Sequence, residues 1–326
     1  MPARLRTLAT FVAVALAGLT LASAAQAAYP DRAIRVIVPF APGGGGDTLA
    51  RMVLNKMAEQ TGWTIIIDNR AGAGGNIGTA AAAKAEPDGY TLAYGTNGTH
   101  GINQALYKNP GFDPIKDFAP ISQFTQIALL LVTNPSIPAK NARELIAYLK
   151  ANPGKINVAS AGNGTTSHLA QVMFANATGV SYQHVPYRGG GPAKIDLLSG
   201  QVQMMIEIMP SVFPLARDGK LHGLAVTTAK RWPLAPEIPT LAEDAVPGFE
   251  VTAWDGLWAP AGTPKEIIAT LNAAARKALT DPQLKEALLK SGAEPVPSTP
   301  DELGKFVESE LPRWGKAVKQ SGATVE

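Results

Sequence analysis

The sequence predicts an α/β fold, in which buried strands alternate with helices along the whole chain. Short β-branched or apolar runs bounded by turn residues are typical of buried strands, and helical patterns separate them. Such alternation indicates parallel sheets with helices on both faces. The expected strands are residues 34–38, 64–67, 91–94, 129–133, 156–160, 204–208 and 224–227.

Capping residues predict where several helices begin and end. Asn141 is expected to cap a helix, with Glu144 reaching back to the cap. Gly292 and Gly322 are expected to end helices, and Pro312 to kink the last one. One apolar helix face over residues 48–60 is marked by Leu49, Val53 and Met57. A cap followed by proline at the first helical position recurs at Thr263-Pro264, Asp281-Pro282 and Thr299-Pro300.

The composition excludes several classes of protein. The chain has 326 residues, 46% hydrophobic and 17% charged, and no cysteine. It therefore has no disulfide, thiolate metal site or cysteine nucleophile, and it has enough apolar residues for a core. At about 150 residues per domain, a chain of this length is expected to form two domains. Of the net charge of +3, two charges come from Arg4 and Arg6, so the rest is nearly neutral and gives no reason to expect nucleic acid or an anionic membrane as a partner.

The first 27 residues resemble a secretory signal peptide. A basic start precedes an apolar run of 14 residues from Leu8 to Leu21, and small residues follow. Cleavage is expected after Ala27, with Ala24 as the alternative. A membrane-spanning helix needs about 20 apolar residues, so this run is too short. Because no cysteine is present to take a lipid anchor, we expect a soluble, exported protein in a bacterial periplasm.

Four glycine-rich turns follow expected strands and lead into expected helices. The first turn of a helix leaves backbone N–H groups unpaired, glycine lets a ligand approach them, and the helix dipole favours an anion there. The turns lack the Gly-Lys-Ser/Thr of a phosphate loop and the third glycine of a dinucleotide fingerprint, so a carboxylate is the expected anion. They occupy residues 39–48, 69–78, 161–167 and 187–192.

No catalytic constellation is recognisable. The four histidines lack metal-ligand spacing, and no serine lies in a G-x-S-x-G motif, so no catalytic residue, metal or cofactor is expected. Glu207 and Asp255 could form an acidic pair, or each could be a hydrogen-bonding group. His168 could contact a ligand or only pack. The same alternatives, pocket wall or core, apply to Phe40, Tyr187, Trp254 and Trp258.

Six motifs resemble the Bug-type substrate-binding proteins of tripartite tricarboxylate transporters. They span essentially the whole chain after the signal and occur in that family's order. The motifs are YPDRAIRVIVPFAPGGGGDTLAR, NRAGAGGNIGTAAAAKAEPDGYTL, GTNGTHGIN, SAGNGTTSHLA, HVPYRGGGPA and AVPGFEVTAWDGLWAPAGTPKEII.

This resemblance implies a periplasmic receptor with the two-lobed fold of type II-like periplasmic binding proteins. Two doubly wound sheets would be joined by a two-strand hinge near residues 126–131 and 250–253. Lobe 1 would comprise residues 28–128 and 252–326, and lobe 2 residues 129–251. The lobes would close on a small carboxylate, such as a dicarboxylate, an amino acid or an aromatic acid, and a monomeric receptor would deliver it to the membrane subunits.

The resemblance also implies a set of ligand contacts, carried over motif by motif. The ligand-binding residues expected from it are Phe40, Ala41, Gly43, Asp47, Asn76, Thr96, Thr99, His100, Asn163, Thr165, Thr166, Ser167, Arg188, Glu207 and Asp255. Phe40 would form a wall, Ala41 and Gly43 would supply backbone N–H groups, and Arg188 would be the fixed positive charge near the mouth.

Two positions depart from the family pattern. Glu207 stands where aspartate is usual, and Asp255 where an apolar, aromatic or amide residue is commoner. Acids near a carboxylate site favour a ligand with fewer negative charges, a hydroxyl or an amine, or a bound cation. Two other functions stay open: a receptor that feeds a sensor kinase, and a periplasmic hydrolase with Glu207 or Asp255 as its base.

Overall fold

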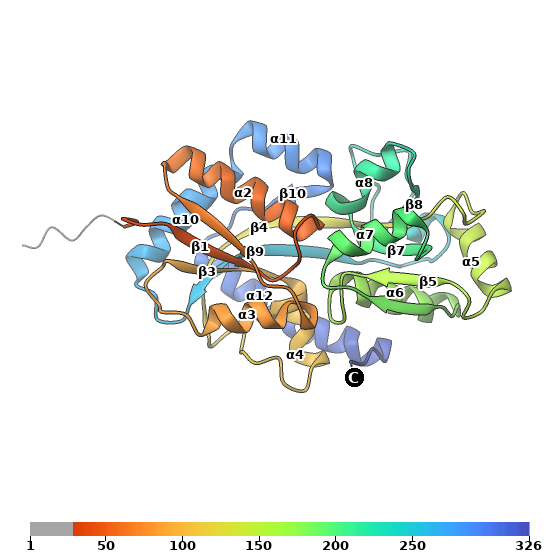
Figure 1. Ribbon diagram of the computed structural model, residues 1–326, viewed down its shortest axis with the longest axis horizontal. Helices are drawn as coiled ribbons and strands as arrows, with labels where there is room; N and C mark the ends of the chain where they lie inside the picture. The colour runs from red at the N-terminus through yellow and green to blue at the C-terminus, as the bar shows by residue number, and fades with distance from the viewer. Residues whose placement is uncertain (1–28, 326) are drawn as a thin grey trace, which may run out of the picture. The chain divides into compact units, whose positions relative to one another are not determined.

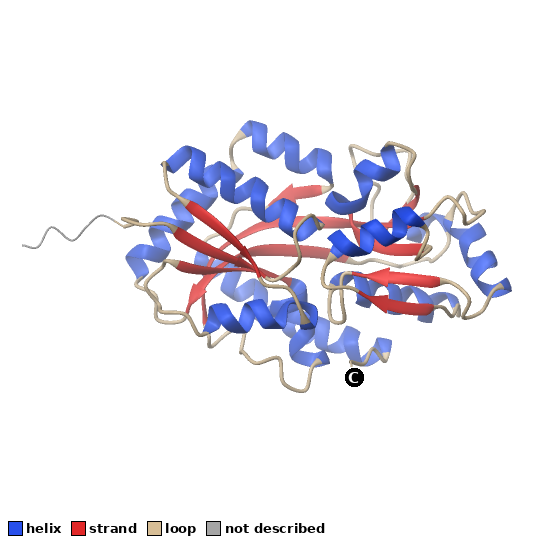
Figure 2. Cartoon of the chain, in the orientation of Figure 1, coloured by secondary structure: helices blue, strands red, loops and turns tan. Residues whose placement is uncertain are grey.

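The computed structural model describes residues 29–325, so the predicted signal peptide lies outside the described residues. Residues from Arg32 onward form one compact unit. Its strands form one hydrogen-bonded sheet in the order β2-β1-β3-β9-β4-β7-β5-β6, with β8 and β10 also paired to β4. Helices lie on both sides of the strands (Figure 2). The predicted α/β class is confirmed.

The first group of strands is built from the two ends of the chain (Figure 1). Its elements are β1 (Ile34–Val38), α2 (Gly45–Thr61), β2 (Ile65–Asn69), η1 (Ala73–Gly75), α3 (Asn76–Ala83), β3 (Thr91–Thr96), η2 (Gly98–Ile102), α4 (Asn103–Leu106), β9 (Thr252–Pro260), α10 (Lys265–Leu279), α11 (Pro282–Ser291), β10 (Ala293–Pro295) and α12 (Pro300–Ser321).

The second group comes from the middle of the chain. Its elements are α5 (Ala142–Ala151), β5 (Asn157–Ser160), α6 (Thr166–Thr178), β6 (Gln183–Pro186), α7 (Gly190–Ser199), β7 (Met204–Ile208), α8 (Met209–Arg217), β8 (His222–Val226) and α9 (Leu241–Asp244).

Strand β4 (Phe118–Thr133) belongs to both groups. Its residues 118–128 pair with β9, and its residues 129–133 pair with β7. The partner changes between Ala128, opposite Thr252, and Leu129, opposite Ile208. A second link joins Thr227 to Val251, whose N–H donates to the Thr227 carbonyl. The lobe boundaries stay a prediction.

The sheet is mixed rather than purely parallel, so that part of the expectation is wrong. Strands β1, β2 and β3 are parallel, as are β5, β6 and β7. Strands β4 and β9, however, run antiparallel to each other and to their other neighbours. The physical reason is that β4 carries the chain from the first group into the second and β9 carries it back, so the two strands run through the centre in opposite directions.

Each group of strands has its own apolar core. One core packs α12 against β3 and β9 through Ala93, Trp258 and Leu303. The other packs α7 and α8 against β4 and β7 and includes Leu130 and Met205. These cores fix the strand ends, and therefore the turns that follow them.

The predicted capping residues largely occupy the expected places. Asn141 accepts from the Glu144 N–H, and Gly292 and Gly322 are left-handed at the ends of α11 and α12. Thr299 forms a capping box with Glu302, and Asp281 caps α11. Thr263 does not cap α10, because Pro264 occupies the cap position. Helix α12 continues through Pro312.

Candidate functional site

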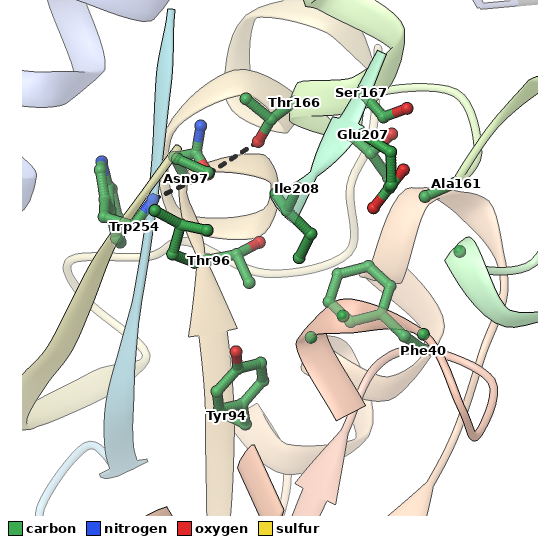
Figure 3. A pocket seen from close by; sticks show the side chains of 17 residues that line it. Phe40, Tyr94, Thr96, Asn97, Ala161, Thr166, Ser167, Glu207, Ile208 and Trp254 are labelled. Carbon is green, nitrogen blue, oxygen red and sulfur yellow. Dashed lines mark hydrogen bonds between the residues drawn. The ribbon is translucent and has the colours of Figure 1, made fainter. Parts of the chain in front are cut away.

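A cavity of about 50 Å³ lies where the two groups of strands meet (Figure 3). Its walls come from the turn after β1, from β3, β4 and β9, and from the ends of β5 and β7 with the helices that follow them. We call it the central cavity. It is lined by Phe40, Gly44, Gly45, Gly46, Tyr94, Thr96, Asn97, Ile127, Ala161, Thr165, Thr166, Ser167, Gly190, Glu207, Ile208, Ala253 and Trp254.

Several helices begin at the central cavity. The first residues of α2, α6 and α7, which are Gly45, Thr166 and Gly190, all line it. Ile208, which directly precedes α8, lines it too. Because the first turn of each helix has N–H groups without partners in the helix and carries the positive end of the dipole, this wall favours negative charge. The four helices meet there because three of the four predicted glycine turns, those after β1, β5 and β6, end the strands at this edge.

The helix starts are in close contact. A Cβ atom on Gly44 would lie 3.0 Å from the Gly191 nitrogen, and one on Gly45 would lie 3.2 Å from the Ser211 nitrogen. The glycines therefore allow α2 to approach α7 and α8 with backbone against backbone.

The structure brings six of the fifteen predicted contact residues to the central cavity: Phe40, Thr96, Thr165, Thr166, Ser167 and Glu207. The other nine do not line it: Ala41, Gly43, Asp47, Asn76, Thr99, His100, Asn163, Arg188 and Asp255. Most of these nine hold its walls in place.

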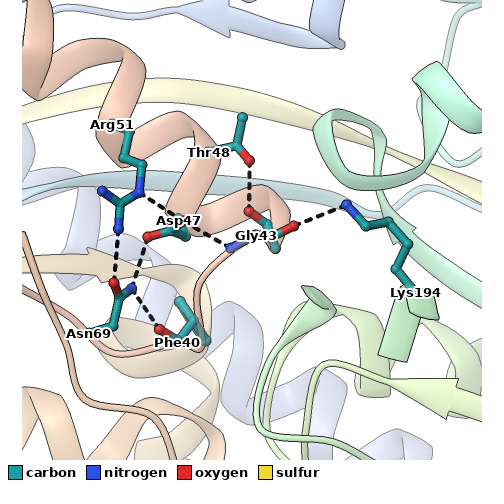
Figure 4. Close-up of polar contacts among 8 residues, drawn as sticks. Phe40, Gly43, Asp47, Thr48, Arg51, Asn69 and Lys194 are labelled. Atoms are coloured by element: carbon teal, nitrogen blue, oxygen red, sulfur yellow. Dashed lines mark hydrogen bonds and ion pairs between the residues drawn. The ribbon is translucent and has the colours of Figure 1, made fainter. Parts of the chain in front are cut away.

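Asp47 fixes the glycine turn after β1 (Figure 4). The residue is 3% exposed, and its carboxylate accepts from the Gly43 N–H at 3.0 Å, from Arg51 Nε at 2.9 Å and from Asn69 Nδ2 at 2.8 Å. Burial by itself would raise the pKa of Asp47, but the hydrogen bonds from Arg51, Gly43 and Asn69 lower it overall. Asp47 is thus an ionised group that shapes the turn.

The turns after β1 and β6 bond directly to each other. The Ala41 N–H donates to the Arg188 carbonyl at 3.1 Å, and Lys194 Nζ of α7 donates to the Gly43 carbonyl at 3.0 Å (Figure 4). The Arg188 side chain is exposed. Its backbone therefore makes the contact here, and the expected positive charge does not reach the cavity wall.

Asn76 and Asn163 support a second contact between the two groups. Asn76 Oδ1 accepts from Asn103 Nδ2 at 2.6 Å, and the Asn163 carbonyl accepts from the Tyr107 hydroxyl at 2.8 Å. A Cβ atom on Gly74 would lie 2.0 Å from the Asn163 oxygen, so η1 and the turn after β5 are in backbone contact.

The segment that follows β3 places an amide in the cavity wall. Asn97 is fully buried, and its Oδ1 accepts from the Thr166 hydroxyl at 2.8 Å. Its Nδ2 has no hydrogen-bond partner in the described part of the chain. Thr99 lies behind the wall, where its hydroxyl accepts from the Thr96 N–H at 3.0 Å and contacts His100 Nδ1 at 2.9 Å.

The aromatic candidates divide between cavity wall and core. Phe40 and Trp254 line the cavity. Trp258 stacks on His100 with ring centroids 4.1 Å apart, and burial lowers the pKa of His100 to about 3. Tyr187 donates to Asp196 at 2.6 Å.

His168 has a packing role rather than a place in the cavity wall. Its Nδ1 accepts from the Gly164 N–H at 3.3 Å, and its ring stacks on that of His184 at 4.6 Å. Burial and the nearby His184 lower the pKa of His168 to about 4.

Asp255 joins three central strands behind the wall. Its Oδ1 accepts from the Thr125 N–H at 2.8 Å and the Thr125 hydroxyl at 2.6 Å, and its Oδ2 accepts from the Tyr94 hydroxyl. Burial raises the pKa of Asp255 to about 6, although these hydrogen bonds by themselves would lower it. Through Tyr94, whose ring lines the cavity, Asp255 positions the wall without reaching the cavity itself.

Glu207 is the acid of the cavity wall. It is 3% exposed, and its Oε2 has no hydrogen-bond partner among residues 29–325. Burial raises the pKa of Glu207 to about 7, although the Ser167 hydroxyl, the Ile208 N–H and the charge of Lys194 oppose that change. Glu207 and Asp255 do not form a pair, since Asp255 is bonded to Thr125 and Tyr94.

Some lining residues escaped the motif-based prediction. Asn97 lies in the GTNGTH motif between the predicted contacts Thr96 and Thr99, so the motif that predicts those two residues also contains it. Tyr94 and Ile208 are strand residues with no local mark of a binding role, because only the packing of distant strands brings them together.

Residues 29–325 contain no cluster of three or more His, Asp or Glu side chains placed to hold a metal ion. None of the helices in that range combines the length and apolar character of a membrane-spanning segment.

Comparison with known proteins gives consistent matches over nearly the whole chain. The profile of the tripartite tricarboxylate transporter family receptor matches residues 49–323. Protein BugT of Bordetella pertussis is 37% identical over 320 residues, which cover 96% of this chain and 98% of BugT. Rpa4515 of R. palustris, solved with adipate, has a TM-score of 0.88 and 38% identity, covering 91% of this chain and all of Rpa4515. MatC of Rhodopseudomonas palustris, solved with bound malate, has a TM-score of 0.84 and 38% identity, covering 89% of this chain and all of MatC.

Proposed function

The chain belongs to the tripartite tricarboxylate transporter receptor family, and from that premise we propose that it is a periplasmic receptor that binds a small organic carboxylate in the central cavity. The observation that carries the proposal is the convergence of helix starts on this cavity. Gly45 of α2 and Thr166 of α6 come from different groups of strands, and each offers backbone N–H groups to an anion. The adipate and malate bound to two relatives support the same ligand class.

Binding is coupled to closure of two lobes, residues 28–128 with 252–326 and residues 129–251. The cavity of about 50 Å³ holds a few water molecules, whereas pockets for small ligands usually exceed about 300 Å³, so the lobes separate to admit the acid. When the lobes separate, the hydrogen bonds that break are Ala41–Arg188, Gly43–Lys194 and Asn97–Thr166. The ligand bridges both lobes only in the closed form, so it shifts the population toward closure.

In this proposal no bond is made or broken, because the receptor only binds and releases its ligand. The chain is exported by the signal of residues 1–27, acts as a monomer and delivers the acid to the transporter's membrane subunits. A pull-down of those subunits by the loaded receptor, but not by the empty one, tests the delivery step.

The ligand is sought first by native mass spectrometry of protein purified without refolding. Binding of adipate and malate is then measured by calorimetry. The double variant Thr165→Val, Thr166→Val is expected to weaken carboxylate binding at least tenfold, about 1.4 kcal/mol. The reason is that Thr166 bonds Asn97 across the cavity and Thr165 caps α6.

Thr270→Val provides the matched control. Thr270 is a partly exposed residue of α10 that does not line the cavity and whose hydroxyl donates to the Glu266 carbonyl of the same helix, so its replacement should leave affinity unchanged. Thr166→Val alone separates binding from helix capping, since it leaves the Thr165 cap in place. Unchanged affinity in the single and double variants would contradict the site assignment.

A further inference from the structure

Glu207 is the one charged residue among the described residues that line the central cavity. Its side chain is 3% exposed, and its Oε2 has no hydrogen-bond partner in residues 29–325. A buried polar atom without a partner costs free energy unless something else satisfies it. An acceptor in this position therefore points to a ligand group that donates a hydrogen bond.

The carboxyl group lies beside the start of α7, and the starts of α2 and α8 come close to each other nearby. A Cβ atom on Gly190, the first residue of α7, would lie 3.2 Å from Glu207 Oε1 and 3.3 Å from the Ser211 hydroxyl at the start of α8. A Cβ atom on Gly45, the first residue of α2, would lie 3.2 Å from the Ser211 nitrogen. The positive end of α7 is thus already faced by an acidic side chain of the protein itself, which takes the position that a ligand carboxylate would otherwise occupy.

The opposite side of the cavity differs in its chemistry. In Figure 3, Thr96, Asn97 and Thr166 lie on one side of Ile208, and Glu207 lies on the other. The first side has Thr166, which is the first residue of α6, together with the Asn97 amide and hydroxyl groups, and no acid. The cavity therefore has one end that suits a carboxylate and another that repels it.

We propose that the ligand carries a single carboxylate, bound at the Thr96–Asn97–Thr166 side, and a hydroxyl or ammonium group that donates to Glu207. This inference rests on the proposed function and narrows its ligand class. Glu207 acts as a specificity residue, because a second carboxylate at that end would face a like charge in a buried site.

The test compares acids of equal length by calorimetry at pH 8.5. For chains of four, five and six carbons, the probes are the dicarboxylate, the ω-hydroxy acid, the ω-amino acid and the unsubstituted monocarboxylate. The wild-type protein is expected to bind an ω-hydroxy or ω-amino acid at least tenfold more tightly than the dicarboxylate of the same length.

Two substitutions then test the residue itself. Glu207→Gln keeps the size but removes the charge, so it should abolish the preference for the ω-amino acid. Glu207→Ala removes the side chain, so the preference should shift at least tenfold toward the dicarboxylate. If Glu207→Ala does not fold, the wild-type panel and Glu207→Gln decide the question.

The outcomes separate the inference from the proposed function. Wild-type binding that favours dicarboxylates at every length, with no change in Glu207→Gln, overturns the inference and leaves the carboxylate receptor standing. Failure of every acid to bind the wild-type protein at millimolar concentration overturns both.

Discussion

Replacing Glu207 by glutamine is expected to change how the stability of the protein depends on pH. Burial raises the pKa of Glu207 in the folded protein from 4.5 to about 7. Between these values the folded protein holds a proton that the unfolded chain has lost, so the free energy of unfolding falls as pH rises through this window. This difference in pKa between the unfolded and folded protein corresponds to about 3 kcal/mol in the free energy of unfolding, since one pKa unit is worth about 1.4 kcal/mol. Glutamine has no proton to lose and resembles the protonated acid.

The assay is urea unfolding of both proteins without ligand from pH 4 to 8.5. Other buried titratable groups, such as Asp255 and His100, are present in both proteins and cancel in the difference. The wild-type protein should lose about 3 kcal/mol relative to Glu207→Gln between pH 4.5 and 7. Glu308→Gln, at an exposed position of α12, should show no such pH-dependent difference. If the free energy of unfolding of the wild-type protein and that of Glu207→Gln differ by the same amount at every pH, the reasoning is refuted. Such a result would mean that the helix starts fully compensate the buried charge.

Two further substitutions test the closed arrangement. A Cβ atom at Gly191 would lie 2.4 Å from a backbone oxygen of the turn after β1, so Gly191→Ala should weaken ligand binding at least fivefold by calorimetry, whereas Gly304→Ala, with no neighbour nearer than 3.6 Å, should not. Trp254 donates to buried Glu310 at 2.7 Å, so Trp254→Phe should lower the free energy of unfolding in urea by about 1–2 kcal/mol. Because Trp254 also lines the cavity, the same substitution should remove the ligand-induced change in tryptophan fluorescence. That fluorescence change should persist in Trp232→Phe, because Trp232 lies in the core of the second group and does not line the cavity. Persistence of the change in Trp254→Phe would argue against binding beside this indole.

The sequence predicts best the short strands that are rich in apolar residues. Residues 34–38 and 204–208 are expected and observed with the same bounds. The sequence pattern does not predict β9, and it predicts only the last five residues of β4. Their unpredicted parts contain Pro120 and Gly256, which interrupt a strand pattern, and the β4–β9 pairing includes register shifts. Long-range antiparallel pairing, rather than local propensity, makes these segments strands.

The candidate site divides in the same way. Thr166 and Ser167 follow from a local pattern, a glycine turn that opens a helix, and they line the cavity. The roles of Asp47 and Asp255 depend on partners far away in the sequence: Asp47 bonds Asn69, and Asp255 bonds a tyrosine 161 positions earlier. Nothing local in the chain says whether an acid near a glycine turn faces inward to a partner or outward to a ligand.

Hydrogen-bond partners distinguish the three buried acids near the cavity. Asp47 accepts from three groups, one of them the Arg51 guanidinium, and its pKa is lowered. Asp255 also accepts three hydrogen bonds, but all come from neutral groups in a fully buried position, and its pKa is raised to about 6.

Glu207 leaves one oxygen without a partner in the described residues, and its pKa is raised to about 7. Asp47 and Asp255 therefore form their hydrogen bonds with the protein itself and fix the position of the cavity wall. Glu207, in contrast, has one oxygen that can accept a hydrogen bond from a ligand. A substitution at Asp47 or Asp255 should thus change the shape of the site, and one at Glu207 should change which acid binds there. Lost affinity for every acid of the panel, without altered preference, in Glu207→Gln would place Glu207 with the structural acids instead.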